Sequence, residues 1–154
     1  RTTGVDLEAR WRTPIDGLNL GAVANWNDSE FRDVYPAVTA SLPNVANGER
    51  LSSTAKYNYR LDADFERPLG SGDLRFFLNG AASRTSSRVM YDGYVVRPYS
   101  LYNASAGIRT DRWELSIFGE NLADERGPSF VRNSLLFAGP YPRTIGLRLR
   151  TTID

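Results

Sequence analysis

Three carboxylates, Asp62, Asp64 and Glu66, recur at alternate positions near the middle of the chain. In an extended strand, a spacing of two places all three side chains on one face. Catalytic carboxylate pairs need environments that shift their pKa values apart, usually through burial. We interpret these three instead as lining a water-filled surface and meeting Arg75, which follows across a short turn.

A fourth carboxylate, Glu114, is expected to pair in the same way. If the segment around residue 114 lies beside the last segment of the chain, Glu114 would face Arg148 or Arg150. Such partly hydrated ion pairs contribute about 0–1 kcal/mol each. Their role would be to keep the polar face compatible with water.

The composition excludes several kinds of chemistry. The chain has no histidine and no cysteine, so disulfides, thiol catalysis, typical zinc sites and histidine-based triads cannot form. An enzyme would also lack a base that titrates near neutral pH. The net charge of +1 gives no field that would attract nucleic acid. We therefore predict that the chain is not an enzyme, holds no cofactor or metal and has no nucleic-acid partner.

A better candidate for ligand binding is a group of arginines and tyrosines between residues 84 and 99. Guanidinium groups and phenol rings can bind an anionic, aromatic small molecule through ion pairs and stacking. An ordinary surface loop can have the same composition, and that reading stays open. The candidate residues are Arg84, Arg88, Tyr91, Tyr94, Arg97 and Tyr99.

The elements that must position these residues are strands. Apolar and polar residues alternate in seven segments, which is the period of a strand with one apolar face. No apolar run approaches the roughly 18–20 residues that a membrane-spanning helix needs. We predict an all-β fold, an antiparallel up-and-down meander of about seven to eight strands. The segments lie near residues 5–12, 18–27, 55–66, 74–83, 102–108, 113–117 and 145–153.

The connections between these segments alternate between short and long. Short turns are expected at 13–17, 68–73 and 110–112, and long loops at about 28–51, 84–100 and 123–141. Each strand has roughly ten residues, enough to cross a bilayer when tilted. Short turns at one end and long loops at the other are typical of outer-membrane barrels.

Aromatic residues on the apolar face fall near both ends of the strands. Such bands are typical of the two interfaces of a membrane barrel, although aromatic residues favour strands in any case. The alternation also fits a soluble, lipocalin-like β-barrel whose apolar face binds a small apolar ligand. The aromatics are Trp11, Phe65 and Trp113 beside the short turns, and Trp26, Tyr57 and Tyr102 nearer the long loops.

Several motifs in the last third of the chain carry a family resemblance. Tyr102-Asn-Ala-Ser105 is followed by a Trp113-led strand that ends in Asn121-Leu122-Ala-Asp124, and Pro142-Arg143-Thr-Ile-Gly146 opens the last strand. In these motifs, the chain from about residue 50 onward resembles the C-terminal barrel strands of TonB-dependent outer-membrane receptors. We interpret Asn121, Leu122 and Asp124 as a structural motif that ends a strand, because Asn and Asp bond to nearby backbone. The N-terminal hairpin is similar to the barrel through less specific residues.

The resemblance implies a single domain, residues 1–154, in the C-terminal part of a barrel of about 22 strands in the bacterial outer membrane. It implies uptake of a scarce ligand such as a ferric siderophore. The implied partners are the lipid bilayer, the remaining strands, a plug, the TonB complex acting through an N-terminal region, and the small-molecule ligand, an iron chelate for example.

Two features depart from that family. The chain ends at Ile153-Asp154 rather than on an aromatic residue, and it has seven strands with no plug. Seven strands of a wide barrel leave two open edges and a broad apolar face, which favour association. Alone, the chain is therefore expected to curl into a small barrel or sandwich, or to self-associate.

Overall fold

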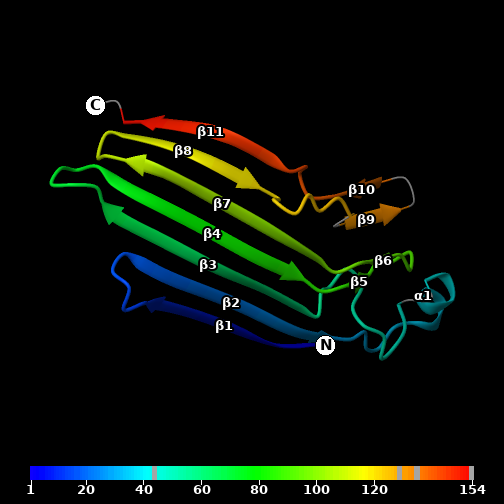
Figure 1. Cartoon of the computed structure of the whole chain (residues 1–154). Coiled ribbons are helices and arrows are strands. Elements are labelled where there is room, and N and C mark those ends of the chain that lie inside the picture. The colour runs from blue at the N-terminus through cyan, green and yellow to red at the C-terminus, as the bar shows by residue number, and fades with distance from the viewer. Residues whose placement is uncertain (43–44, 128–129, 134–135, 153–154) are drawn as a thin grey trace.

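A single antiparallel sheet of seven strands dominates the computed structural model, which describes residues 1–42, 45–127, 130–133 and 136–152 (Figure 1). Neighbours in the sheet follow one another in sequence, apart from short hairpins inserted in the connections, so the topology is the predicted up-and-down meander. The predicted Ile153-Asp154 end lies outside the described residues. The strands are β1 (Thr2–Arg12), β2 (Leu18–Ser29), β3 (Tyr57–Pro68), β4 (Arg75–Thr85), β7 (Tyr99–Arg109), β8 (Trp113–Glu120) and β11 (Thr144–Thr151).

Short turns lie at one end of the sheet and long connections at the other, as the sequence predicts (Figure 1). The β1–β2 turn closes through a hydrogen bond from the Thr13 backbone nitrogen to the Leu18 carbonyl oxygen, at 3.1 Å. Gly17 in this turn has a φ of 84°, and a Cβ there would collide with the Glu66 carbonyl oxygen on β3. The turn therefore requires glycine for both its backbone conformation and its packing.

The long connections hold regular elements where the sequence predicts loops. The first contains α1 (Pro36–Ser41), the second pairs β5 (Arg88–Val89) with β6 (Val95–Val96), and the third pairs β9 (Phe130–Asn133) with β10 (Leu136–Ala138). Strands of two to four residues are too short for alternation to stand out. No helix in the described ranges is long and apolar enough to span a membrane.

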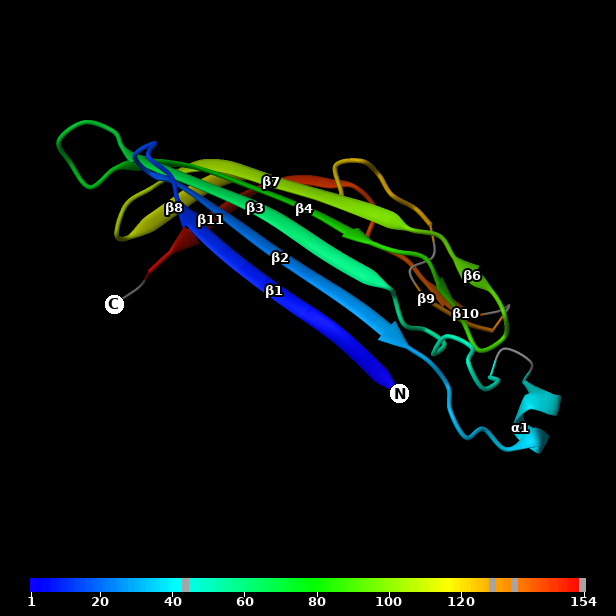
Figure 2. The same ribbon diagram turned by 90° about the horizontal axis from the view of Figure 1, so that it is seen from below.

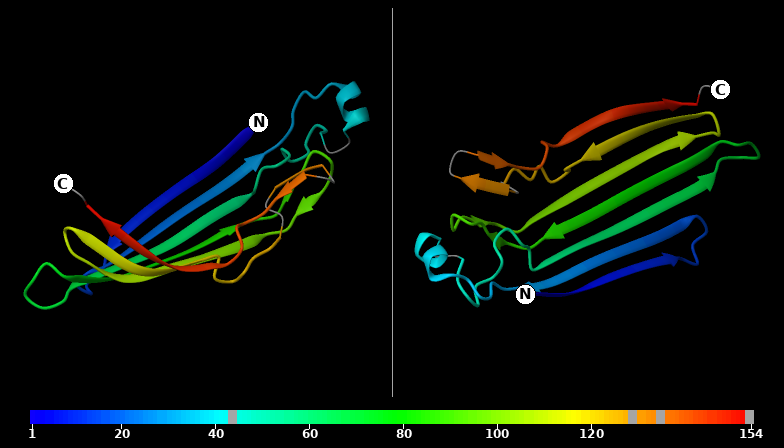
Figure 3. Two further views of the ribbon diagram at one scale, coloured as in Figure 1. Left: turned by 90° about the horizontal axis from the view of Figure 1, so that it is seen from above. Right: turned by 180° about the vertical axis from the view of Figure 1, so that it is seen from behind.

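The register places most apolar residues of the seven strands on one face. Leu7 lies opposite Ala24, Ala24 opposite Tyr59, and so on across the sheet. This face is uncovered, since Leu7, Leu61 and Leu147 are 65%, 54% and 77% exposed. Figures 2 and 3 show one curved layer, with the long connections beyond one end.

The fold has almost no core of its own. The buried hydrophobic residues among those described are Val45, Phe77, Met90 and Val96. The sheet stays open, with β1 and β11 at its two edges. The small barrel or sandwich expected for an isolated chain is therefore not the form of this structure, and the apolar face needs an apolar medium or a partner.

Candidate functional site

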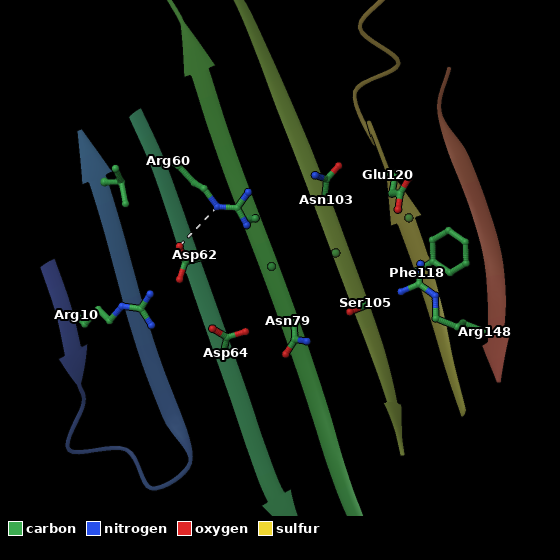
Figure 4. A pocket seen from close by; sticks show the side chains of 15 residues that line it. Arg10, Arg60, Asp62, Asp64, Asn79, Asn103, Ser105, Phe118, Glu120 and Arg148 are labelled. Atoms are coloured by element: carbon green, nitrogen blue, oxygen red, sulfur yellow. Dashed lines mark ion pairs between the residues drawn. The ribbon is translucent and has the colours of Figure 1, made fainter. Parts of the chain in front are cut away.

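The face opposite the apolar one is polar and holds a hollow of about 590 Å³. Strand alternation brings charged residues from both edges and the middle of the sheet onto it, as Figure 4 shows. At one side of the hollow, the Arg148 guanidinium lies over the Phe118 ring, 4.5 Å from its centroid. The lining includes Arg10, Arg60, Asp62, Asp64, Asn103 and Arg148.

The alternating carboxylates lie on this polar face, as predicted. The Arg60 Nε atom is 3.7 Å from Asp62 Oδ1, and both side chains are partly exposed (Figure 4). Gly21 on β2 makes room for Asp62, because a Cβ there would meet the carboxylate. An open hollow lined by polar and charged residues supports the lining interpretation over a catalytic pair.

Glu66 is the centre of a charged network near the short turns. The predicted pairing with Arg75 is confirmed for Glu66, since Arg75 Nη1 lies 3.5 Å from Glu66 Oε1. For Asp62 and Asp64 it is wrong, because the carboxylates that Arg75 pairs with among the described residues are those of Glu66 and Asp111. Glu66 also pairs with Arg109, which lies directly opposite Arg75 in the register. The single carboxylate thus lies between two guanidinium groups and offsets part of their mutual repulsion. Arg109 also lies over the buried Phe77 ring, 5.2 Å from its centroid.

Glu114 pairs differently from the prediction. The register does place Arg150 opposite Glu114, because β8 and β11 are neighbours. The ion pair that Glu114 makes, however, is with Arg109 Nη1 at 3.8 Å, on the neighbouring strand β7. Arg109 is already held close to Glu114 by Glu66, whereas Arg150 lies on the edge strand.

The Asn121 motif joins the end of β8 to the start of β11. Asn121 has a φ of 50° and is 5% exposed. Its Nδ2 atom donates to the carbonyl oxygens of Glu125 and Tyr141, at 2.9 and 2.8 Å, and its Oδ1 accepts from the Glu125 backbone nitrogen at 2.9 Å. Leu122 extends the ladder by donating from its backbone nitrogen to Tyr102. These contacts support the structural interpretation of the motif.

Asp124 makes a second link between the Asn121–Asp124 motif and the Pro142-Arg143 motif. Its Oδ1 atom accepts from the Arg143 backbone nitrogen at 3.4 Å, directly after Pro142. Its Oδ2 atom accepts from Arg126 Nε and Nη2, at 3.0 and 2.6 Å. The hydrogen bond from Arg126 holds the pKa of the Asp124 carboxyl below its usual value. The side chains of Pro142 and Arg143 are exposed, so the backbone supplies this contact.

Three of the six predicted ligand residues meet at the long-loop end. Tyr94, Arg97 and Tyr99 line a concavity of about 460 Å³, together with Glu125 and Gly127 from the β8–β9 connection. Glu125 is not among the residues that the sequence predicts for this site, although it directly follows the Asn121–Asp124 motif. The concavity offers a cation, a carboxylate and two phenol rings to a small molecule.

The other three candidates lie outside this concavity. Arg88 lies in β5 opposite Val96, and Tyr91 is exposed in the turn that follows. The hairpin rests on Met90 and Val96, which are buried, and Met90 Sδ accepts a hydrogen bond from Ser53 Oγ at 3.7 Å. Arg84 is in strand β4, which extends to Thr85, and lies opposite Tyr59 and Ser100 on the apolar face.

Comparisons with known proteins agree on one fold. A family model described as "TonB dependent receptor-like, beta-barrel" matches residues 1–122, a range that includes the N-terminal hairpin and ends inside the Asn121 motif. The crystal structure of the ferric yersiniabactin uptake receptor FyuA from Yersinia pestis is similar with a TM-score of 0.76 and 22% identity. That match covers 97% of this chain and 23% of the FyuA chain, and it concerns the fold alone. No curated protein matches the sequence.

Proposed function

The chain belongs to the TonB-dependent receptor-like β-barrel family, and on this premise we propose that it supplies barrel wall and extracellular loops to a receptor that takes up a scarce small molecule. Proteins of this family are transport receptors of the outer membrane, not enzymes, and we propose no catalytic activity here. The proposal treats residues 1–154 as one domain in the C-terminal part of a larger barrel.

The observation that carries the proposal is the uncovered apolar face. A soluble barrel would bury this face, whereas Leu7, Leu61 and Leu147 are more than half exposed here. Aromatic side chains lie at both ends of it, with Trp11 at 58% and Trp26 at 42% exposure. In a bilayer, lipid chains would surround the centre of this face, and each aromatic band would lie at a membrane–water interface.

The opposite face suits the lumen of such a barrel. Its ion pairs, including Arg60 with Asp62 and Arg75 with Glu66, are partly exposed and compatible with water. We propose that this face surrounds a plug, that the sheet edges β1 and β11 pair with the remaining strands, and that the TonB complex acts through another part of the full receptor. These partners would cover the two open edges.

For the ligand, we propose an anionic chelate with aromatic groups, of the ferric siderophore class. The support is the concavity where Arg97 lies with Tyr94 and Tyr99. A guanidinium group can pair with a carboxylate or phenolate of the chelate, and the phenol rings can stack on its aromatic groups. The similar fold of a ferric yersiniabactin uptake receptor is compatible with this class.

The experiment is uptake by cells that carry the full-length receptor. Cells with the receptor, cells without it, and cells with the Arg97→Ala receptor are given radiolabelled iron on a panel of anionic and cationic chelators. We expect receptor-dependent uptake of an anionic chelate, with loss of most of it in the variant. Receptor in the soluble fraction, or equal iron uptake with and without the receptor, would refute the proposal.

A further inference from the structure

Two cations interrupt the apolar face of the described strands. Alternation from Leu61 and Ala63 places Arg67 of β3 on this face near the short turns. The register places Arg84 of β4 on it at the opposite end, between Tyr59 and Ser100. By the same alternation, the other arginines within the seven-stranded sheet lie on its polar face, so Arg67 and Arg84 can be compared with each other.

Arg67 is neutralised within the protein. Its Nη2 atom lies 3.4 Å from Asp16 Oδ2, and its Nε donates to the Asp16 carbonyl oxygen at 3.2 Å. Asp16 belongs to the neighbouring β1–β2 turn. An arginine held by a carboxylate in this way needs no external anion.

Arg84 has no such carboxylate. Within the described part of the chain, its polar contact is a hydrogen bond from Nη1 to the neutral Ser100 Oγ at 3.2 Å, and no carboxylate oxygen lies within 4.0 Å. The side chain is half-buried on an apolar surface. A guanidinium group there, with one hydrogen bond to the residues that the structure describes, has donors that can bind an anion from outside the chain.

The surroundings of Arg84 indicate the depth at which that anion lies. Tyr59 is its neighbour in the register, and Tyr57 and Tyr59 stack with their ring centroids 6.3 Å apart. Tyr102 lies one row further down the same face, opposite Ala82. Tyrosines in such a band mark the level of lipid headgroups in a membrane protein. Arg84 thus has its stem along apolar surface and its charge at headgroup level.

We propose that Arg84 and Ser100 bind a phosphate group of an anionic lipid in the leaflet at the long-loop end. The guanidinium fork matches phosphate geometry, and the Ser100 hydroxyl adds a donor beside it. The acyl chains would lie over the small and apolar residues below, Ala82 and Leu61 among them. This inference rests on the proposed function in one respect, namely that the apolar face contacts lipid.

The test is native mass spectrometry of the purified full-length receptor, titrated with bis-phosphorylated lipid A. The arginine on the same face that already has a carboxylate provides the control, so Arg84→Gln is compared with Arg67→Gln. We expect about tenfold weaker lipid binding in Arg84→Gln, which corresponds to one lost charge-assisted contact. Arg67→Gln should stay within about twofold, and Arg84→Lys, which keeps the charge but not the fork, should weaken binding less than Arg84→Gln does.

A second comparison needs no variant, so it holds even if Arg84→Gln fails to fold. The unmodified receptor is titrated with the same lipid after removal of both phosphates, and binding should fall by a similar factor. Equal binding of the two lipids, or equal losses in both glutamine variants, would overturn the inference. A failure of the proposed function is seen separately, as absent iron uptake by the unmodified receptor.

Discussion

The side-chain nitrogen of Asn121 donates to the carbonyl oxygen of Tyr141 at 2.8 Å, across a separation of twenty residues. This contact ties the end of β8 to the segment that leads into β11, while Asp124 accepts from the Arg143 backbone nitrogen beside it. The whole β8–β11 connection is therefore anchored at its base. The same anchor fixes Glu125, which lines the concavity with Arg97.

Replacement of Asn121 with alanine should loosen this base. Three side-chain hydrogen bonds are lost, their partners are part-buried, and alanine disfavours a φ of 50°. We expect a destabilisation of about 2 kcal/mol, measured by thermal unfolding of the full-length receptor in detergent. Leu122→Ala, beside it and partly exposed, is the control and should cost less. An unchanged melting temperature in Asn121→Ala would contradict the anchoring role.

Asp124 should make the stability of this connection depend on pH. Its pKa is lowered in the folded protein by the hydrogen bond from Arg126, so the carboxylate favours the folded state at neutral pH. That contribution is full above the unfolded pKa of about 3.9 and is lost as the pH falls through the lower folded pKa. Melting curves between pH 3 and 6 should therefore converge for the unmodified receptor and Asp124→Asn at the acid end. Parallel curves would show that Asp124 contributes nothing.

The seven main strands could be located from the sequence because an apolar face imposes a period of two over about ten residues. Their ends could not be fixed as well, since several differ from the prediction by two or three residues. The pairing of Glu66 with Arg75 could also be predicted, since a short turn fixes which residues of the two strands lie close together. The β5–β6 hairpin could not be predicted, because strands of two residues are too short to show an alternating pattern. Its support comes from Met90, which contacts Ser53 in another connection.

The candidate site likewise has a part that could be predicted from the sequence and a part that could not. Tyr94, Arg97 and Tyr99 are close in sequence, and their grouping was predicted. Glu125 comes from a different connection. Its position beside these residues depends on the tertiary structure and could not be predicted from the local sequence. Arg84 adjoins the predicted loop in the sequence, yet β4 continues past it and alternation places Arg84 on the apolar face.

Two strand glycines should differ sharply in their tolerance of alanine. A Cβ at Gly107 would collide with the Leu115 carbonyl oxygen and lie 2.7 Å from Ser116 Cβ, whereas a Cβ at Gly80 meets nothing within 4 Å. We expect Gly107→Ala to destabilise the barrel by about 1–3 kcal/mol through overpacking. Gly80→Ala should be neutral or slightly stabilising, since alanine has fewer unfolded conformations. Heat-modifiability on gels and thermal melts would measure both, and equal effects would argue against the β7–β8 packing.

The concavity at the long-loop end predicts a charge-specific pattern of ligand affinity. Arg97 lines it, whereas Arg88 lies outside it in β5 on the same hairpin. Loss of one charged contact should weaken binding of an anionic iron chelate to Arg97→Ala about tenfold, as measured by fluorescence quenching on the full-length receptor. Arg88→Ala should stay within about twofold, because its charge is the same and only its position differs.

Glu125 provides the opposite test of the same concavity. Its carboxylate lies in the lining with Arg97 and repels an anionic ligand, so Glu125→Gln should bind an anionic chelate more tightly and a cationic chelate more weakly. The glutamine keeps the backbone hydrogen bonds to Asn121, which do not involve the carboxylate. A change of the same sign for both chelates would point to a shift of the loop rather than to charge. If Arg97→Ala and Arg88→Ala weakened binding equally, the ligand would lie over the hairpin tip and not in this concavity.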